Sequence, residues 1–384
     1  MTMTRLLGQF QDQQQHVLNH CLNTKPDYRT QYHPELSPAG WHLGHCIFTE
    51  NYWTREVLLG LGSCDERMKF LYIPTHSPKA SRSKTLPEYD ALYNWAKTSQ
   101  QENRALLQNA LNKKTKEKLL RNGYLIKFLI QHYAQHYETL QLIATQAALG
   151  KTYNFSVKNP INGSIQHRTT CHVPNGEYQI GATENFAPYD NEYPRHTVVS
   201  GEIHITENPV CNSDYLSFME AGGYTTKSFW SDEGWQWCKK NNVQHPEYWR
   251  KDKYDNWYEI TITGASNLKP GEPIFGISHY EASAFANWSR ARLPYEYEWE
   301  IADQEKLLKN TGKVWEWCQN TFQPYAGFEA FPYTGYSTPY FDGRHFVLKG
   351  ASFHTQNIIR RTSFRNYYPA DKRHMFAGMR LVFE

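Results

Sequence analysis

The stretch YLIKFLIQHYAQHYETLQLIATQAALG, which spans residues 124–150, has the pattern of one long amphipathic helix. Its last residue is a glycine, the residue type that most readily adopts the left-handed conformation at a helix end. His132 and His136 are four residues apart and therefore lie one turn apart on the same face. The leucines of this face are Leu125, Leu129 and Leu140. Both imidazoles are thus predicted to point into an apolar core.

Three further helical patterns precede this stretch. One covers about residues 4–18, and another runs from about residue 87 past residue 107. Between them a helix is predicted to begin at Ser37, a favourable N-cap residue, with Pro38 at the first helical position. Four amphipathic helices joined by loops predict an antiparallel helical bundle.

The helix that follows Pro38 carries a third histidine on its apolar stripe. The stripe is spaced i, i+4, i+7, i+11 and consists of Trp41, His45, Phe48 and Tyr52. Any one of these histidines alone is more often a hydrogen-bonded core residue. Three imidazoles that converge in a core satisfy one another poorly by hydrogen bonds, but they form a facial set of metal ligands. Nitrogen-only ligands leave coordination positions open, which suits iron, copper or catalytic zinc, and the residues alone leave that choice open.

Beyond Gly150 the sequence changes character, and Gly, Pro, Asn and aromatic residues become frequent. Short alternating runs at residues 196–205 and 346–348 predict strands. Helical patterns remain at residues 210–221 and 279–290. This half of the chain is therefore expected to be an irregular α+β domain built mainly of loops.

A chain of 384 residues is longer than a single core usually grows, so two domains are expected. The predicted fold class is α+β, without an internal repeat. Its predicted parts are a four-helix bundle over residues 1–150, a linker over residues 151–165 and a second domain over residues 166–384.

The composition excludes several classes of protein. The net charge of +3 comes from 41 basic and 38 acidic residues scattered along the chain, so the basic patch of a nucleic-acid binder is missing. We find no signal peptide and no run of about 20 apolar residues that could span a bilayer. The seven cysteines are odd in number, widely spread and without a C-x-x-C pair, which argues against a disulfide framework and a structural zinc site. A cytoplasmic protein with reduced thiols is expected.

Two motifs in the first half and several in the second half point to one family. The first-half motifs are Ser37-Pro38-x-x-Trp41-x-Leu43-x-His45 and His132-x-x-x-His136-x-Glu138. The second-half motifs include Arg292-Leu293-Pro294, Val314-Trp315-Glu316-Trp317, Leu348-x-Gly350-x-Ser352-Phe353 and Gly378-x-Arg380. Over nearly its whole length the chain resembles the ergothioneine-type sulfoxide synthases (hercynine oxygenases). These join a DinB-like four-helix bundle to a C-terminal domain of the formylglycine-generating-enzyme type, which is C-type-lectin-like.

The resemblance implies roles for residues of the bundle. His45, His132 and His136 would be the ligands of an iron(II) ion, with O2 as co-substrate. Gln135 matches a residue that contacts the substrate imidazole. Glu138 would accept the N–H of a ligand ring and so fix its orientation.

The resemblance also implies roles in the second domain. Tyr333 and Tyr336 fall in a Tyr-x-x-Tyr stretch that matches the active-site tyrosines of the family, with Tyr333 favoured as the proton donor in the oxygen chemistry. Asn366 and Tyr367 align with the Asn-Trp pair that holds hercynine, so that the tyrosine ring would offer a face to the trimethylammonium group. The pocket is expected between the domains.

The residues for the sulfur donor depart from the family pattern. Arg82 fits the arginine of the donor site, and Lys372 or Arg373 stands near a second one, but Tyr368 occupies the position of an aspartate. Without this carboxylate, γ-glutamylcysteine is expected to be a poor donor compared with cysteine or a selenosugar. Phe353 and His354 occupy the region of the copper-binding cysteines of formylglycine-generating enzymes, so copper chemistry of that kind is excluded here.

The function that the resemblance implies is an O2-dependent non-heme iron(II) oxidoreductase. It would join the imidazole of hercynine to a thiol donor by a C–S bond and give a sulfoxide. A selenoneine synthase that uses a selenosugar is one alternative. A metal- and ligand-binding DinB–lectin-like protein without catalysis is another. The expected partners are small-molecule substrates, with neither nucleic acid nor membrane.

Overall fold

The computed structural model describes residues 3–62, 66–112, 118–165, 169–183 and 187–383. It divides into two compact units, each of which is described by itself. The first unit is Met1–Gly150 together with Gln356–Ile359, and the second is Lys151–Thr355 together with Arg360–Glu384.

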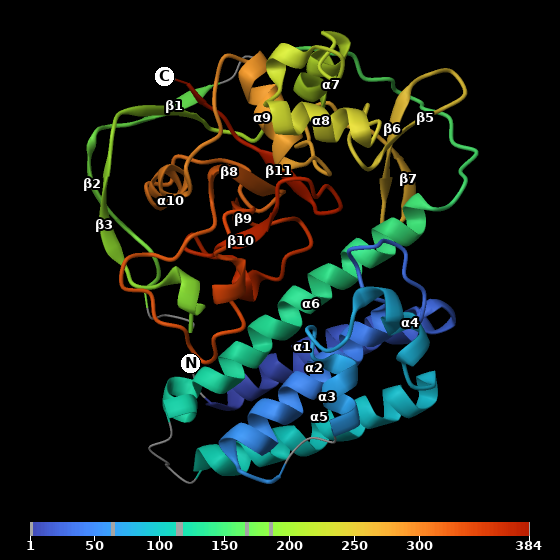
Figure 1. The fold of residues 1–384 in the computed structure, drawn as a ribbon, viewed down its shortest axis with the longest axis vertical. Helices are drawn as coiled ribbons and strands as arrows, with labels where there is room; N and C mark the ends of the chain where they lie inside the picture. The colour runs from blue at the N-terminus through green and yellow to red at the C-terminus, as the bar shows by residue number, and fades with distance from the viewer. Residues whose placement is uncertain (1–2, 63–65, 113–117, 166–168, 184–186, 384) are drawn as a thin grey trace. The chain divides into compact units, whose positions relative to one another are not determined.

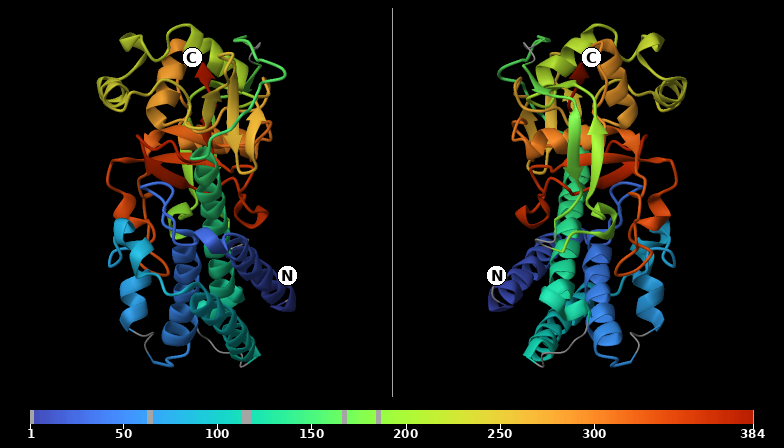
Figure 2. Two further views of the ribbon diagram at one scale, coloured as in Figure 1. Left: turned by 90° about the vertical axis from the view of Figure 1, so that its right-hand side faces the viewer. Right: turned by 90° about the vertical axis from the view of Figure 1, so that its left-hand side faces the viewer.

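Helices α1 (Met3–Asn23), α2 (Ala39–Asn51), α5 (Tyr89–Asn112) and α6 (Tyr124–Leu149) build the first unit (Figure 1). Helix α1 packs against α6, and α2 packs against both α5 and α6. Figure 2 shows α2 and α6, in blue and green, running alongside each other from two further sides. The predicted helical bundle is thereby confirmed.

Shorter elements connect these helices. A π-helical segment, Tyr52–Leu58, continues α2 directly. The others are the 3-10 turns Lys25–Asp27, Lys79–Ser81 and Lys118–Gly123 and the helices α3 (Glu66–Tyr72) and α4 (Arg82–Thr85).

The start of α2 differs from the prediction. Pro38 is the N-cap residue, and no side chain caps the helix. The hydroxyl of Ser37, predicted to be the cap, instead accepts a hydrogen bond from Arg82. Because Arg82 is buried, its guanidinium needs such acceptors inside the protein.

The second unit is built around small sheets. The four-stranded sheet has the order β10-β9-β8-β11, and β11 runs parallel to β8 while the other pairs are antiparallel. The remaining sheets have the orders β1-β4-β12, β5-β6-β7 and β2-β3, all antiparallel. The strands are β1 (Thr170–Val173), β2 (Gly176–Ile180), β3 (His196–Ser200), β4 (Ile203–Thr206), β5 (Trp249–Lys251), β6 (Trp257–Thr261), β7 (Gly264–Asn267), β8 (Trp315–Thr321), β9 (His345–Gly350), β10 (Asn366–Pro369), β11 (Ala377–Met379) and β12 (Val382–Phe383).

Helices and turns complete this unit. They are α7 (Asn212–Glu220), α8 (Asp232–Lys240), α9 (His279–Trp288) and α10 (Glu296–Gln304), with 3-10 turns at Asp190–Glu192, Lys227–Phe229 and Thr338–Tyr340. A further 3-10 turn, Asn357–Ile359, belongs to the first unit. The mixed α+β character of the second half is confirmed. The run 196–205, predicted as one strand, is two strands, because Gly201 and Glu202 separate β3 from β4.

Fully buried ion pairs tie this unit together. Lys349 on β9 lies 2.8 Å from Glu300 on α10, and both side chains are completely buried. Arg380 and Glu316 form a second pair of the same kind at 2.8 Å. Removing one partner of such a pair leaves an uncompensated buried charge, which costs about 3–5 kcal/mol. These four residues are therefore structural.

No helix among the described residues is long and apolar enough to cross a membrane. The cysteines of the described part of the chain are all free thiols: Cys21, Cys46, Cys171, Cys211, Cys238 and Cys318.

Candidate metal centre

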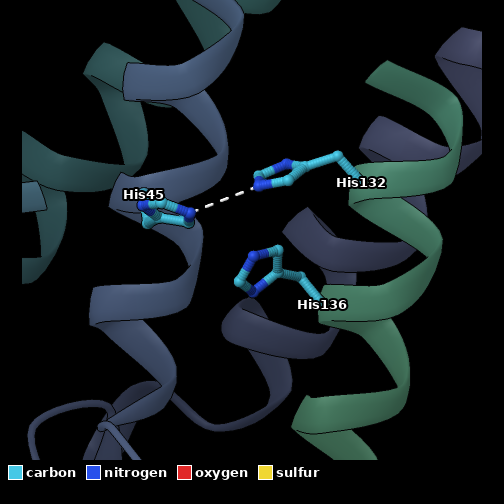
Figure 3. A group of neighbouring side chains, drawn as sticks. All are labelled: His45, His132 and His136. Atoms are coloured by element: carbon cyan, nitrogen blue, oxygen red, sulfur yellow. Dashed lines mark hydrogen bonds between the residues drawn. The ribbon is translucent and has the colours of Figure 1, made fainter. Parts of the chain in front are cut away.

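Three histidines from two helices converge in the first unit. His45 projects from α2, and His132 and His136 project from successive turns of α6 (Figure 3). One nitrogen of each ring can be chosen so that all three lie within 4.8 Å of one another. This spacing suits a facial three-nitrogen ligand set.

The environment of His45 fixes its tautomer. The Nδ1 atom lies 2.7 Å from the backbone carbonyl of Tyr72. A carbonyl oxygen can only accept, so Nδ1 carries the proton and the lone pair is on Nε2. Nε2 in turn lies 3.2 Å from Nε2 of His132, as the dashed line in Figure 3 shows. The structure thus directs the lone pair of His45 Nε2, which could bind a metal ion, toward the rings of α6.

A fourth histidine, which the sequence reasoning missed, touches the group. His42 lies three residues before His45 on α2, and its Nδ1 is 2.9 Å from Nδ1 of His136. Its spacing of i, i+3 from His45 was the signal that could have found it. This contact leaves Nε2 of His136 available to the site.

The three rings fit a metal ion in their protonation as well as their position. Desolvation lowers the pKa of His45 to about 4. Desolvation and neighbouring histidines hold the pKa values of His132 and His136 well below the ordinary value. The rings are therefore neutral at pH 7, as metal ligation requires. Nδ1 of His132 is buried without a hydrogen-bond partner in the described part of the chain, so the hydrogen bonds of the metal-free site do not satisfy all of its ring nitrogens.

Arg82 and Trp41 form a stack behind His45. The indole ring of Trp41 is parallel to the His45 ring within 8°, at a centroid distance of 4.8 Å. The Arg82 guanidinium lies 3.7 Å from the centroid of Trp41. Arg82 is only 4% exposed and donates to the carbonyl oxygens of Ser77 at 2.9 Å and Pro74 at 3.3 Å. This geometry gives Arg82 a structural role behind His45, and its predicted contact with the sulfur donor stays a prediction.

Glu138, predicted to accept the N–H of a ligand ring, lies on α6 and is buried. The outer nitrogens of His45 and His136 contact the Tyr72 carbonyl and His42. The role of Glu138 stays a prediction. Gln135, between the two ligands of α6, is half-buried.

The two predicted active-site tyrosines lie on one loop of the second unit, before the turn Thr338–Tyr340. The ring of Tyr336 stacks on Tyr189 at a centroid distance of 4.2 Å, whereas Tyr333 is 42% exposed. Partial burial, and then the neighbouring Tyr340 and Asp190, raise the pKa of Tyr333 to about 12. Its hydroxyl therefore keeps its proton at neutral pH.

Asn366 and Tyr367 begin β10. The side-chain oxygen of Asn366 accepts a hydrogen bond of 2.9 Å from the Tyr367 backbone N–H. The hydroxyl of Tyr367 donates to the carbonyl of Tyr336 at 2.8 Å, which brings β10 to the tyrosine loop. Phe322 stacks on the Tyr367 ring at 4.1 Å and thereby covers one of its faces.

The cations near the C-terminus have partners inside the second unit. Arg373 lies 3.0 Å from the buried carboxylate of Glu281 and donates to the carbonyl of His245. The buried carboxylate of Glu281 needs this counter-charge, which gives Arg373 a structural role, and its predicted contact with the substrate stays a prediction. Lys372 lies 3.2 Å from Asp371. The ring of Tyr368 meets His374 edge to face at 5.8 Å.

Two family descriptions match this chain. The Sulfatase-modifying factor enzyme 1-like domain matches residues 158–310 and 304–384, and the DinB superfamily matches residues 2–140. Together these matches cover both of the units described above.

Curated relatives span most of the chain. A protein named hercynine oxygenase from Mycolicibacterium smegmatis is 28% identical over 413 residues, which cover 92% of this chain and 92% of the relative. One from Mycolicibacterium thermoresistibile is 27% identical and covers 93% of this chain and 90% of the relative. One from Mycobacterium tuberculosis is 29% identical over 53% of this chain and 58% of the relative. The chain belongs to the family of the Sulfatase-modifying factor enzyme 1-like domain, joined here to an N-terminal unit of the DinB superfamily, and it is similar over most of its length to relatives named hercynine oxygenase.

Proposed function

We propose that this protein is an O2-dependent non-heme iron(II) oxygenase that joins the imidazole of hercynine to a thiol donor and yields a sulfoxide. The observation that carries the proposal is the convergence of His45, His132 and His136, whose three ring nitrogens lie within 4.8 Å of one another. The names of the relatives that span more than nine-tenths of the chain support the substrate.

The ligand set supports the reaction type. Three neutral imidazoles occupy one face of an ion and leave the remaining positions to exogenous ligands. Iron(II) held by His45, His132 and His136 would supply O2 activation and a common template for both substrates. A partly buried site with no carboxylate among its ligands keeps the bound ion cationic and so favours anionic ligands such as a thiolate.

Other residues would act on the substrates directly. Gln135 lies between two ligands on α6, where its amide can hydrogen-bond a substrate imidazole. Asn366 and Tyr367 are proposed to hold hercynine. Tyr333, whose pKa is raised to about 12, is protonated at neutral pH and is proposed to donate that proton during C–S bond formation.

The function is tested by turnover. The metal-free protein is loaded with Fe(II) under nitrogen, mixed with hercynine and one of three donors, and exposed to air. Mass spectrometry identifies the products, and an oxygen electrode measures O2 uptake. Cysteine, γ-glutamylcysteine and a selenosugar are compared by kcat/KM. Because Tyr368 stands where the family has an aspartate, we expect γ-glutamylcysteine to be the poorest donor. A product formed only with the selenosugar would identify a selenoneine synthase. Binding of iron and hercynine without oxygen uptake would refute the proposal that the protein is an enzyme.

The ligand assignment has its own test. We expect His45→Ala, His132→Ala and His136→Ala each to abolish stoichiometric iron binding while leaving most of the helicity intact, because each removes one of only three ligand atoms. Iron content is measured by plasma emission spectroscopy and helicity by circular dichroism. His76→Ala, at an exposed histidine of the same unit, is the matched control. Stoichiometric iron in two of the three variants would disprove the assignment.

A further inference from the structure

His42 is a buried histidine with one directed contact. It is only 6% exposed, and its Nδ1 lies 2.9 Å from Nδ1 of His136. Its second nitrogen, Nε2, is buried and meets no hydrogen-bond partner among the described residues. Leaving a polar group in this state costs about 1–3 kcal/mol. For the fold alone, an apolar side chain of similar size would therefore be the more stable choice.

The contact between His42 and His136 allows only one arrangement that is compatible with metal binding. Two neutral rings that face each other through Nδ1 must share a single proton between them. If His42 donates, His136 carries its own proton on Nε2 and has no lone pair for a metal. If His136 donates, its Nε2 lone pair is exposed to the site. The second arrangement places the proton of His42 on its buried Nε2.

The three proposed ligands differ in the hydrogen-bond partner of the ring nitrogen that faces away from the site. A backbone carbonyl, that of Tyr72, accepts from His45. Nδ1 of His132 has no partner within the described ranges. Within the described residues, the outer nitrogen of His136 hydrogen-bonds a side chain, and that side chain is on α2, the helix that also carries His45. The His42 contact therefore links the position of His136 on α6 to the helix that supplies the other ligand.

We propose that His42 is a positioning residue of the metal centre, whose Nδ1 accepts the proton of His136 Nδ1 and so fixes the tautomer and the ring plane of this ligand. The inference rests on the proposed metal site but not on the identity of either organic substrate. Partners that orient ligand histidines in this way typically contribute a factor of about 10–100 to metal affinity.

Two substitutions separate hydrogen bonding from packing. His42→Leu fills a similar volume without an acceptor, and it also removes the unsatisfied Nε2–H, so the fold should not lose stability. His42→Asn places its side-chain oxygen close to the former position of Nδ1 and retains the acceptor. The full-length, metal-free proteins are titrated with Co(II) under nitrogen, with its visible absorption as the readout of affinity and ligand geometry.

We expect His42→Leu to weaken Co(II) binding about 10–100-fold and to change the absorption spectrum, and His42→Asn to restore most of the affinity and the wild-type spectrum. Wild-type affinity in His42→Leu would overturn the inference, and so would equal losses in both variants, since they would indicate a purely steric role. A wild-type protein that binds no Co(II) would overturn the metal centre itself. Hercynine turnover plays no part, so failure of the substrate assignment leaves this result unaffected.

Discussion

At the scale of the single residue, the surroundings of His45 suit its proposed role as a metal ligand. The Tyr72 carbonyl holds its Nδ1 proton, and Trp41 covers one face of the ring. Desolvation lowers its pKa to about 4. The ring is thus neutral, oriented and shielded before any ion arrives, so little reorganisation is needed on binding.

This pKa predicts how the stability of the metal-free protein depends on pH. In the unfolded chain His45 binds a proton below about pH 6.5, whereas the folded protein excludes that proton until about pH 4. The free energy of unfolding should therefore fall as the pH drops from about 6.5 to about 4, by up to about 3 kcal/mol from this residue. Urea unfolding of the wild type and His45→Gln across this range measures the difference. Parallel curves for the two proteins would contradict the prediction.

Tyr333 gives a second prediction at this scale, which rests on the proposed function. Without its hydroxyl, Tyr333→Phe should divert oxygen from sulfoxide formation toward oxidation of the thiol, because C–S bond formation then lacks its proton donor. The same direction is expected for Tyr336→Phe if the two tyrosines act together. The ratio of sulfoxide to disulfide is measured by mass spectrometry. Tyr254→Phe, at an exposed tyrosine, is the control, and unchanged ratios in both test variants would exclude these tyrosines from the mechanism.

The sequence could predict that His132 and His136 share a face because their spacing is local. His132 and His136 follow the period of one helix and share its leucine face, so their direction could be predicted without knowing the fold. The surroundings of Arg82 and Glu138 could not be predicted in this way, since a motif position does not reveal which groups surround a side chain. Arg82 turned out to be buried against Trp41. His42 was missed because its partner is on another helix.

At the scale of the helix, one buried carboxylate links the four long helices of the first unit. Glu50 on α2 is fully buried and accepts hydrogen bonds from Tyr133 on α6 at 2.7 Å, Gln14 on α1 at 2.9 Å and Asn103 on α5 at 2.9 Å. Burial raises the pKa of Glu50, and these hydrogen bonds oppose that rise. Tyr133 is adjacent to His132, so this network sets the register of the two helices that carry the metal ligands.

Removing one hydrogen-bond donor from this network should lower the stability of the first unit. Tyr133→Phe leaves a lone pair of a buried carboxylate without its partner, and we expect a loss of about 1–3 kcal/mol in the free energy of unfolding. A smaller loss of metal affinity should accompany it, because the register of α2 and α6 is less firmly held. Urea unfolding and Co(II) titration measure the two effects. Tyr137→Phe, at a half-buried tyrosine of the same helix, is the control, and an equal loss there would argue against the network.

The helices were easier to predict than the strands, for a physical reason. Residues Tyr124–Leu149 form α6 with the predicted bounds, since the spacing of apolar residues along a long amphipathic helix shows which of its faces is buried. The strands of the second unit are short, and although β6 and β7 pair as neighbours, others pair over long distances in sequence, as β4 does with β12. The partners of these others lie outside any local window. Family motifs, rather than periodicity, therefore carried the prediction of this unit.

At the scale of the whole molecule, an experiment can distinguish the effect of metal on the first unit, which carries the proposed ligands, from its effect on the second unit. His45, His132 and His136 all belong to the first unit, and so do His42, Tyr72 and Trp41, which hold their rings. The second unit has its own buried ion pairs and sheets. A metal ion that binds only the folded first unit can add stability to that unit alone.

Calorimetry of the full-length protein should therefore show a selective effect of metal. At a free Co(II) concentration about 100 times the dissociation constant, the folded first unit gains about 2.7 kcal/mol. For a unit of this size that gain raises the midpoint of its unfolding transition by roughly 5–10 °C, while the transition of the second unit stays where it is. Circular dichroism at the same temperatures assigns the shifted transition, because the first unit is predominantly helical. The shift should disappear in His132→Ala and persist in His76→Ala. An equal shift of both transitions would mean that metal binding stabilises the second unit as well, and that its residues must then be counted as part of the metal centre.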